Sequence, residues 1–443
     1  MSKSTNTSRP DSKKSELLED YADRPVPDSE TKDWFNIGVV FVGSIIAIPI
    51  LLLGFVLGHK LTLSGLIIST LAGTAIVTLI TIPTSMVGAK TRLSTYMISK
   101  FTFGKSGAKV VALVIAVTMF GWVGINLGVF GFSLQEILSN TFSISINQSL
   151  IIGFSGLLMI LTAIFGFKGL HKLSLFSVPL LGILLILSLY KAFGQGGVIS
   201  SLMSGGSLST GAAISMVVGS VIAASVYKPD LTRYAETPKQ GAGAAAFGHL
   251  LMLPILLIIS AIAAAPTGAE EFNKVMYSLG LGTFGFIVLF LASWSTNDNN
   301  LYVSSLGLNT IFPLKKWQIT VIVGIAGTLL AIWGILDQFQ SWLLLLSVAI
   351  PPIASVYLAD FYLFNREFYK FENIDKISNL RIFPFISWFI GSIGGYMTMP
   401  VKSNGLGLFK LTTISTLDAM LISLVVYVIG YKLFIEDRLR EDQ

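Results

Sequence analysis

Long apolar runs separated by short charged connections dominate the chain from residue 34 onwards. Crossing a bilayer takes about 20 apolar residues, and this spacing predicts twelve membrane-spanning helices. The third and eighth runs exceed one perpendicular span, which predicts tilt or an extension beyond the bilayer. The approximate bounds are 34–57, 61–88, 107–137, 148–167, 172–193, 211–228, 241–264, 279–310, 317–336, 341–363, 382–400 and 413–434.

Composition supports the membrane assignment. Of 443 residues, 53% are hydrophobic and 12% charged, whereas a soluble protein carries about 25% charged residues. With no cysteine and only three histidines, disulfides, thiolate sites and a histidine-rich metal centre are excluded. The predicted fold class is an all-α integral membrane protein. Its net charge of +6 is distributed along the connections, which points to lipid and not to nucleic acid as the partner.

Basic residues are distributed unevenly between the connections. Sixteen Lys and Arg residues fall on one side of the predicted spans and five on the other, and the richer side is cytoplasmic. Both termini are therefore predicted to lie in the cytoplasm, flanking a multi-pass protein of the cytoplasmic (inner) membrane. Residues 1–33 form a polar tail without the apolar core of a secretory signal, and residues 436–443 form a second tail.

Two spans look interrupted. Segment 34–57 combines Gly43 with Pro49, and proline removes a helical hydrogen bond. Segment 211–228 carries Gly219-Ser220 and ends before Pro229. Interrupted helices at matching places in two halves indicate the midplane site of a secondary transporter, whereas close glycine packing is the structural alternative. The spacing predicts a ten-helix 5+5 inverted-repeat core over 34–363 and two additional helices over 364–435.

The densest polar cluster inside a span is Ala292-Ser-Trp-Ser-Thr-Asn-Asp-Asn-Asn-Leu-Tyr302. Polar side chains at this depth are expected to face protein or a water-filled route. The hydroxyls of Ser295 and Thr296, with the carbonyl of Ala292 one turn earlier, form an oxygen set suited to sodium. Hydroxyls bonded back to their own helix are the alternative.

Four further residues carry candidate chemistry. Trp122, between Gly121 and Gly124, is either a stacking platform for a planar ring or ordinary core. His249 and Asp360 are candidates for proton relay, although a hydrogen-bonded structural role is favoured for both. Asp298 caps or braces the polar cluster. The Pro351-Pro352 pair predicts a kink.

These stretches resemble the nucleobase–cation symport family, the purine–cytosine permease and hydantoin transporter group, and most closely its bacterial cytosine permease branch. The Trp-hydroxyl-Thr-Asn-Asp-Asn run and the Ile-Pro-Pro motif are the more specific pieces. All of them occur in family order and cover most of 34–363. The matching pieces are Val87-Gly-Ala-Lys-Thr91, Phe101-Thr-Phe-Gly104, Gly121-Trp122, Val217-Val-Gly-Ser220, Trp294-Ser-Thr-Asn-Asp-Asn299, Ala349-Ile-Pro-Pro352 and Ala359-Asp360.

The resemblance implies a leucine-transporter-like (LeuT-like) fold that works by alternating access as a monomer, with no cofactor other than a coupling sodium ion. It also implies a substrate site in which Trp122 stacks on a planar ring while Ser220 and Asn297 hydrogen bond to it. The implied sodium site uses the carbonyls of Gly43, Ala47 and Ala292 and the hydroxyls of Ser295 and Thr296.

Three departures from the family pattern affect this site. Met119 stands where cytosine permeases have a glutamine, Val221 where a second aromatic completes the ring sandwich, and Ala292 where an asparagine precedes the sodium hydroxyls. One stacked face is worth about 1–3 kcal/mol, and a paired amide discriminates strongly. Met119 and Val221 therefore count against cytosine itself, whereas Ala292 costs little because its ligand is a backbone carbonyl.

The predicted function is import of a nucleobase-like planar heterocycle by sodium-coupled symport. A proton-coupled symporter that uses His249 or Asp360 is one alternative, and an amino-acid or amine transporter of the same architecture is another. No catalytic carboxylate pair, histidine cluster or activated nucleophile is apparent in the sequence, so an intramembrane enzyme is not expected.

Overall fold

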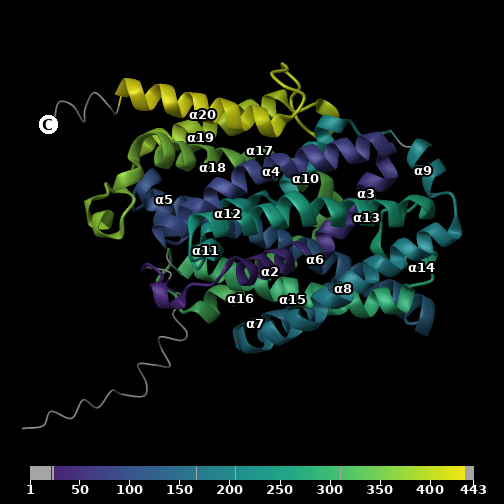
Figure 1. Cartoon of the computed structure of the whole chain (residues 1–443). Helices are drawn as coiled ribbons and strands as arrows, with labels where there is room; N and C mark the ends of the chain where they lie inside the picture. Colours follow the sequence, from purple (N-terminus) through teal and green to yellow (C-terminus); the bar gives the residue numbers. More distant parts are fainter. Residues whose placement is uncertain (1–20, 22–23, 166, 205, 310, 435–443) are drawn as a thin grey trace, which may run out of the picture.

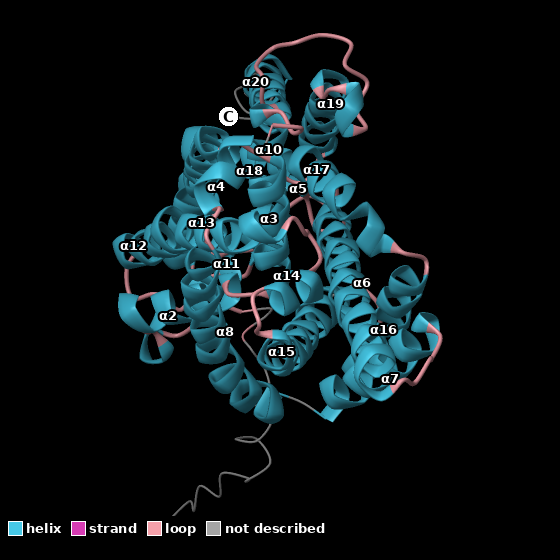
Figure 2. Ribbon diagram, turned by 90° about the vertical axis from the view of Figure 1, so that its right-hand side faces the viewer, coloured by secondary structure: helices cyan, strands magenta, loops and turns pink. Residues whose placement is uncertain are grey.

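The computed structural model describes residue 21 and residues 24–165, 167–204, 206–309 and 311–434. Most of the predicted N-terminal tail and all of the predicted C-terminal tail lie outside these residues. The described part is a bundle of helices. Figure 1 shows α19 and α20 together along one edge and α7 and α16 along the opposite edge, and Figure 2 agrees.

Each predicted span coincides with a helix or a short series of helices. In chain order these are α2 (Trp34–Ile45) with α3 (Ile48–Lys60), α4 (Leu63–Thr91), α6 (Gly107–Phe142), α7 (Gln148–Phe165), α8 (Phe167–Gln195), α10 (Thr210–Val226), α12 (Pro238–Ala246) with the π-helix η2 (Phe247–Met252) and α13 (Leu253–Ala264), α15 (Gly282–Asn309), α16 (Lys316–Ile332), α17 (Phe339–Ala349) with α18 (Pro351–Ala359) and the π-helix η5 (Asp360–Asn365), α19 (Ile382–Thr398) and α20 (Ser415–Phe434).

Among the described residues, five helices or helix runs are long and apolar enough to cross a membrane, or six when the bent pair α2–α3 counts as one span. Five shorter apolar helices accompany them. The predicted multi-pass membrane protein is thus confirmed, whereas the count of twelve crossings stays a prediction. Short helices lie at the two ends of the bundle: α5 (Thr95–Phe103) and α11 (Pro229–Thr232) at one end, α9 (Val198–Ser204) and α14 (Phe272–Ser278) at the other (Figure 1).

The predicted interruption of the first span is confirmed. The axes of α2 and α3 differ by 59°, and Ala47 between them is extended, with φ −139° and ψ 151°. Pro49 lies in the first turn of α3, where its missing N–H costs nothing. At the other end of α2, the Asn36 amide donates to Asp33 at 2.9 Å and lowers the pKa of that carboxyl.

The tenth span is discontinuous at Ile350, next to the Pro351-Pro352 pair, although the run from Ile335 to Phe368 is long and apolar enough to count as one span. α17 ends at Ala349 and α18 begins at Pro351. The indole N–H of Trp388 on α19 donates to the Ala349 carbonyl at 2.7 Å, which supplies a partner for a carbonyl at the kink. A neighbouring helix therefore supplies the hydrogen-bond donor for a carbonyl at this discontinuity.

The predicted break at Gly219-Ser220 is wrong, because α10 runs without interruption from Thr210 to Val226. A Cβ atom built on Gly219 would lie 1.9 Å from the carbonyl oxygen of Leu343 on α17. Gly219 is therefore needed for close approach of two helices, which is the packing role of glycine in membrane bundles.

The close contact at Gly219 predicts that an added methyl group lowers the stability of the protein. Gly219→Ala should lower stability by about 1–3 kcal/mol, the usual cost of overpacking, because the methyl group meets backbone. Gly182→Ala on α8 is the matched control: its Cβ would meet nothing within 4 Å. Thermal unfolding in detergent should show a lower midpoint for Gly219→Ala only, and equal midpoints would contradict the contact.

Candidate functional site

Trp122 and Asn297 lie at the same depth of the bundle on two antiparallel helices, α6 and α15. The rings of Phe130 on α6 and Phe290 on α15 have centroids 5.6 Å apart. Eight residues back along α6 and eight forward along α15 lead to Trp122 and Asp298, which therefore lie at one level. A Cβ atom built on Gly307 of α15 would lie 3.9 Å from the carbonyl oxygen of Ala112 on α6. Ten residues forward along α6 and ten back along α15 lead to Trp122 and Asn297. Two separate contacts thus give the same level.

The half-helix α17 connects this level to α10. A Cβ built on Gly121 would lie 2.2 Å from the indole of Trp342, and one on Gly219 would meet the backbone of Leu343. The two glycines immediately precede Trp122 and Ser220. Because consecutive residues of α17 contact both, the predicted substrate residues of α6, α10 and α15 share one layer; Figure 2 shows α17 beside α10.

The side chains of this layer are buried. Trp122, Met119 and Val221 belong to one apolar core, against which Trp342 packs. Trp122 is 8% exposed, so its ring face is covered by protein in this conformation. The Ser220 hydroxyl donates to the Val217 carbonyl of its own helix at 2.7 Å, which leaves its oxygen as an acceptor only.

Most of the polar cluster of α15 is buried in protein, as predicted, whereas Asn299 is exposed. Asn297 is fully buried, and its amide nitrogen donates to the Met159 sulfur at 3.3 Å. Its carbonyl oxygen has no partner. The Thr162 hydroxyl lies 3.1 Å from an Asp298 carboxyl oxygen and 2.9 Å from the Met159 carbonyl, so these two oxygens share its one proton. The same Thr162 oxygen accepts a hydrogen bond from Trp294 at 2.9 Å. Asp298 therefore braces α15 against α7.

The predicted sodium ligands are divided between the helix break and α15. Because α2 ends at Ile45, the carbonyls of its last turn lack helical partners. One of them, the Val42 carbonyl, accepts a hydrogen bond from the Ile46 amide at 3.1 Å. The Gly43 carbonyl belongs to this turn. The Ala47 carbonyl accepts the Ile50 amide at 3.0 Å.

On α15, Ala292 and Ser295 are buried and Thr296 is half-buried. α3, which begins immediately after the break, contacts α15. Ala47 thus directly precedes an element that contacts α15, and the assignment of the five ligands as a set stays a prediction.

His249 lies within the π-helix η2 and is fully buried. Its Nδ1 is 3.0 Å from the Thr81 hydroxyl oxygen, which donates its own proton to the Val77 carbonyl at 2.8 Å. Nε2 is buried without a partner among the described residues. The Lys228 ammonium lies 3.8 Å from the ring centroid of Phe41 on α2, and that ring makes an edge contact with His249.

Asp360 has the structural role that the sequence favoured. The carboxylate is fully buried and accepts hydrogen bonds from the hydroxyl groups of Tyr369 and Tyr427, the latter at 2.6 Å, and from the Asn365 amide at 2.7 Å. Arg381 pairs with it at 3.2 Å. This cluster, here called the Asp360 hub, joins α18 to α19 and α20.

Sequence reasoning missed two residues of the layer, Asn126 and Trp342. Asn126 lies one turn after Trp122 and donates to the Trp122 carbonyl at 2.9 Å, while its own carbonyl oxygen is buried without a partner. Its isolated polarity in an apolar run was a usable signal. Trp342 reaches the layer only through the packing of α17, for which one sequence carries no signal.

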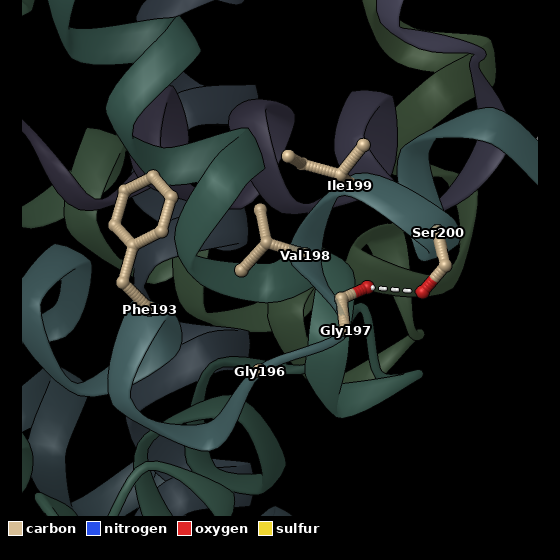
Figure 3. A pocket seen from close by; sticks show the side chains of 6 residues that line it. All are labelled: Phe193, Gly196, Gly197, Val198, Ile199 and Ser200. Atoms are coloured by element: carbon tan, nitrogen blue, oxygen red, sulfur yellow. Dashed lines mark hydrogen bonds between the residues drawn. The ribbon is translucent and has the colours of Figure 1, made fainter.

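The hollow drawn in Figure 3 does not belong to this site. It lies at the turn between α8 and α9 and is lined by Phe193, Gly196, Gly197, Val198, Ile199 and Ser200. The Ser200 hydroxyl donates to the Gly197 carbonyl at 2.9 Å. This apolar surface hollow therefore presents little chemistry for a polar ligand.

The described residues include no group of three or more His, Cys, Asp or Glu side chains that could hold a metal ion.

Comparisons with known proteins agree with this architecture. A family model described as permease for cytosine/purines, uracil, thiamine and allantoin matches residues 25–379. The cytosine permease of Escherichia coli (strain K12) is 30% identical over 379 residues, which cover 85% of this chain and 88% of that protein. The hydantoin permease of Microbacterium maritypicum is 23% identical over 362 residues, covering 75% and 73%.

One solved structure with the same fold is the inward-facing conformation of Mhp1. It superimposes with a TM-score of 0.78 at 17% identity and covers 93% of each chain.

Proposed function

Because the chain belongs to the family of permeases for cytosine, purines, uracil, thiamine and allantoin, we propose that it imports a nucleobase-like planar heterocycle by sodium-coupled symport. It is a multi-pass membrane transporter and not an enzyme. The observation that carries the proposal is the broken span α2–α3, bent by 59°, beside a helix that buries a polar cluster. A helix break of this kind supplies ion ligands in secondary transporters.

The proposed substrate site uses the layer around Trp122. Its indole would stack on the ring, worth about 1–3 kcal/mol per face, and the unpaired Asn297 oxygen would accept a ring N–H. Ser220 would contribute its oxygen, while Met119 and Val221 would form apolar walls. Equal depth of Trp122 and Asn297 supports this assignment.

The proposed sodium site combines the carbonyls of Gly43, Ala47 and Ala292 with the hydroxyls of Ser295 and Thr296. Freed carbonyls in the last turn of α2 support it. Sodium would stabilise the outward-open form and preorganise the substrate site. By linkage, each ligand would then raise the affinity for the other by the same factor.

The proposed topology has twelve spans, of which the first ten form two inverted repeats, with both termini cytoplasmic. The two ends of the bundle support this topology. The connections that contain α5 and α11 are rich in Lys and Arg, whereas α9 and α14 lie at the opposite end (Figure 1). A monomer would suffice, since the proposed site uses helices of one chain.

Uptake by proteoliposomes tests the function. An inward sodium gradient should drive accumulation of at least one labelled base or ureide from a panel of uracil, cytosine, hypoxanthine and hydantoin. Accumulation that persists without a sodium gradient and follows a proton gradient would favour the proton-coupled alternative, in which the unpaired Nε2 of buried His249 becomes the first candidate. No accumulation under either gradient would overturn the proposal.

Ser295→Ala tests the ion site. Removing one oxygen ligand should raise the sodium concentration for half-maximal uptake about tenfold, since a contact to a charged group is worth roughly 1.5–3 kcal/mol. Ser304→Ala on the same helix is the control, because that hydroxyl donates to the Asn300 carbonyl at 2.8 Å. Equal sodium dependence in both variants would remove Ser295 from the site.

A further inference from the structure

Trp342 carries a buried hydrogen-bond donor with no acceptor. It lies on α17 with its indole against Gly121, the residue before Trp122. Its Nε1 is buried and has no partner among the described residues. An indole N–H can only donate, and buried polar groups in native proteins are nearly always paired. An unpaired donor beside the proposed substrate site indicates a ligand acceptor.

The other donors of this layer are already used. The Ser220 hydroxyl donates to the Val217 carbonyl. The amide nitrogens of Asn126 and Asn297 donate to the Trp122 carbonyl and the Met159 sulfur. Met119 and Val221 carry no donor side chain. Among the buried side-chain nitrogens and hydroxyls of this layer, Trp342 Nε1 is thus the donor atom without a partner among the described residues.

The orientation of Asn297 makes it the complementary acceptor. Thioether sulfur accepts but cannot donate, so the Met159 contact fixes the amide nitrogen on that side and leaves the oxygen unpaired. The layer therefore offers one buried N–H without a partner, from Trp342, and two such amide oxygens, from Asn297 and Asn126. A planar ring with an N–H next to a carbonyl presents the matching acceptor and donor.

We propose that Trp342 is a specificity-determining residue whose N–H donates to a ring carbonyl of the substrate, while Asn297 accepts the adjacent ring N–H. The inference rests on the proposed function and narrows it. The substrate class is the cyclic amides and ureides, such as uracil, hypoxanthine and hydantoin. At the corresponding edge adenine has an amino group in place of the carbonyl and an unprotonated ring nitrogen in place of the N–H, so its donor and acceptor are the reverse of what Trp342 and Asn297 offer.

The first test uses ligands on the unaltered protein. Competition against uptake of whichever panel compound is transported should rank hypoxanthine at least tenfold above adenine, which differs at the carbonyl and its adjacent N–H. Equal competition by the two purines would overturn the inference while leaving the transport proposal intact. If no panel compound is transported or competes, the proposed function itself fails, and this inference with it.

The second test removes the donor and keeps the ring. Trp342→Phe should raise the KM for the carbonyl-bearing substrate about tenfold, with little change in kcat and none in competition by adenine. Trp333→Phe is the control, because Trp333 is 79% exposed and outside the layer. An unchanged KM in a Trp342→Phe protein that retains sodium-dependent uptake would show that the indole only packs, and would overturn the assignment.

Discussion

Asp360→Asn is expected to lower the stability of the protein by about 3–5 kcal/mol, the usual cost of removing one partner of a buried ion pair. The Asp360 hub directs donors from Tyr369, Tyr427, Asn365 and Arg381 at one carboxylate. An amide in its place keeps the shape but turns an N–H toward these donors. Thermal unfolding in detergent should show a large fall in the midpoint.

Glu367→Gln is the matched control. It also neutralises a carboxylate facing a cation, but its partner Lys370 lies 3.5 Å away and both side chains are more than half exposed. Exposed pairs contribute about 0–1 kcal/mol, so its unfolding midpoint should hardly change. If Asp360→Asn were equally mild and uptake became independent of pH, Asp360 would have to be reconsidered as a proton carrier.

Trp122→Ala should raise the KM for the transported heterocycle by about 10- to 100-fold, through loss of a stacking face worth roughly 1–3 kcal/mol. The smaller side chain also leaves a void in the core that contains Met119 and Val221, so a lower unfolding midpoint is expected as well. Radiolabelled uptake at several substrate concentrations measures the change in KM.

Trp122→Phe separates the two effects, because it keeps an aromatic face and most of the volume. Its KM should lie between the wild-type and Trp122→Ala values at near-normal stability. A Trp122→Ala protein that is destabilised but has an unchanged KM would identify the side chain as ordinary core, and stacking would have to be assigned elsewhere.

Features encoded locally could be predicted from the sequence. Apolar run length located the apolar helices, and proline with glycine located the break between α2 and α3. The polar residues of α15 implied their burial in protein, because lipid does not tolerate them.

Features that depend on contacts between distant segments could not be predicted. Gly219 suggests a flexible point in the sequence, but in the fold it admits the backbone of Leu343, and the helix stays intact. Trp342 reads as one more interfacial aromatic until α17 brings it against Gly121. For Asp360, sequence alone favoured a structural role but could not name the partners, of which Tyr369, Arg381 and Tyr427 come from later segments.

The Asp360 hub also limits how the molecule can be dissected. Every donor to this carboxylate comes from a residue beyond 363, although the carboxylate terminates the tenth span. A protein shortened to its first ten helices would bury an anion with nothing to neutralise it. We therefore expect that a minimal carrier cannot be obtained by cutting after that span, and that the last two helices must be retained or Asp360 redesigned together with the cut.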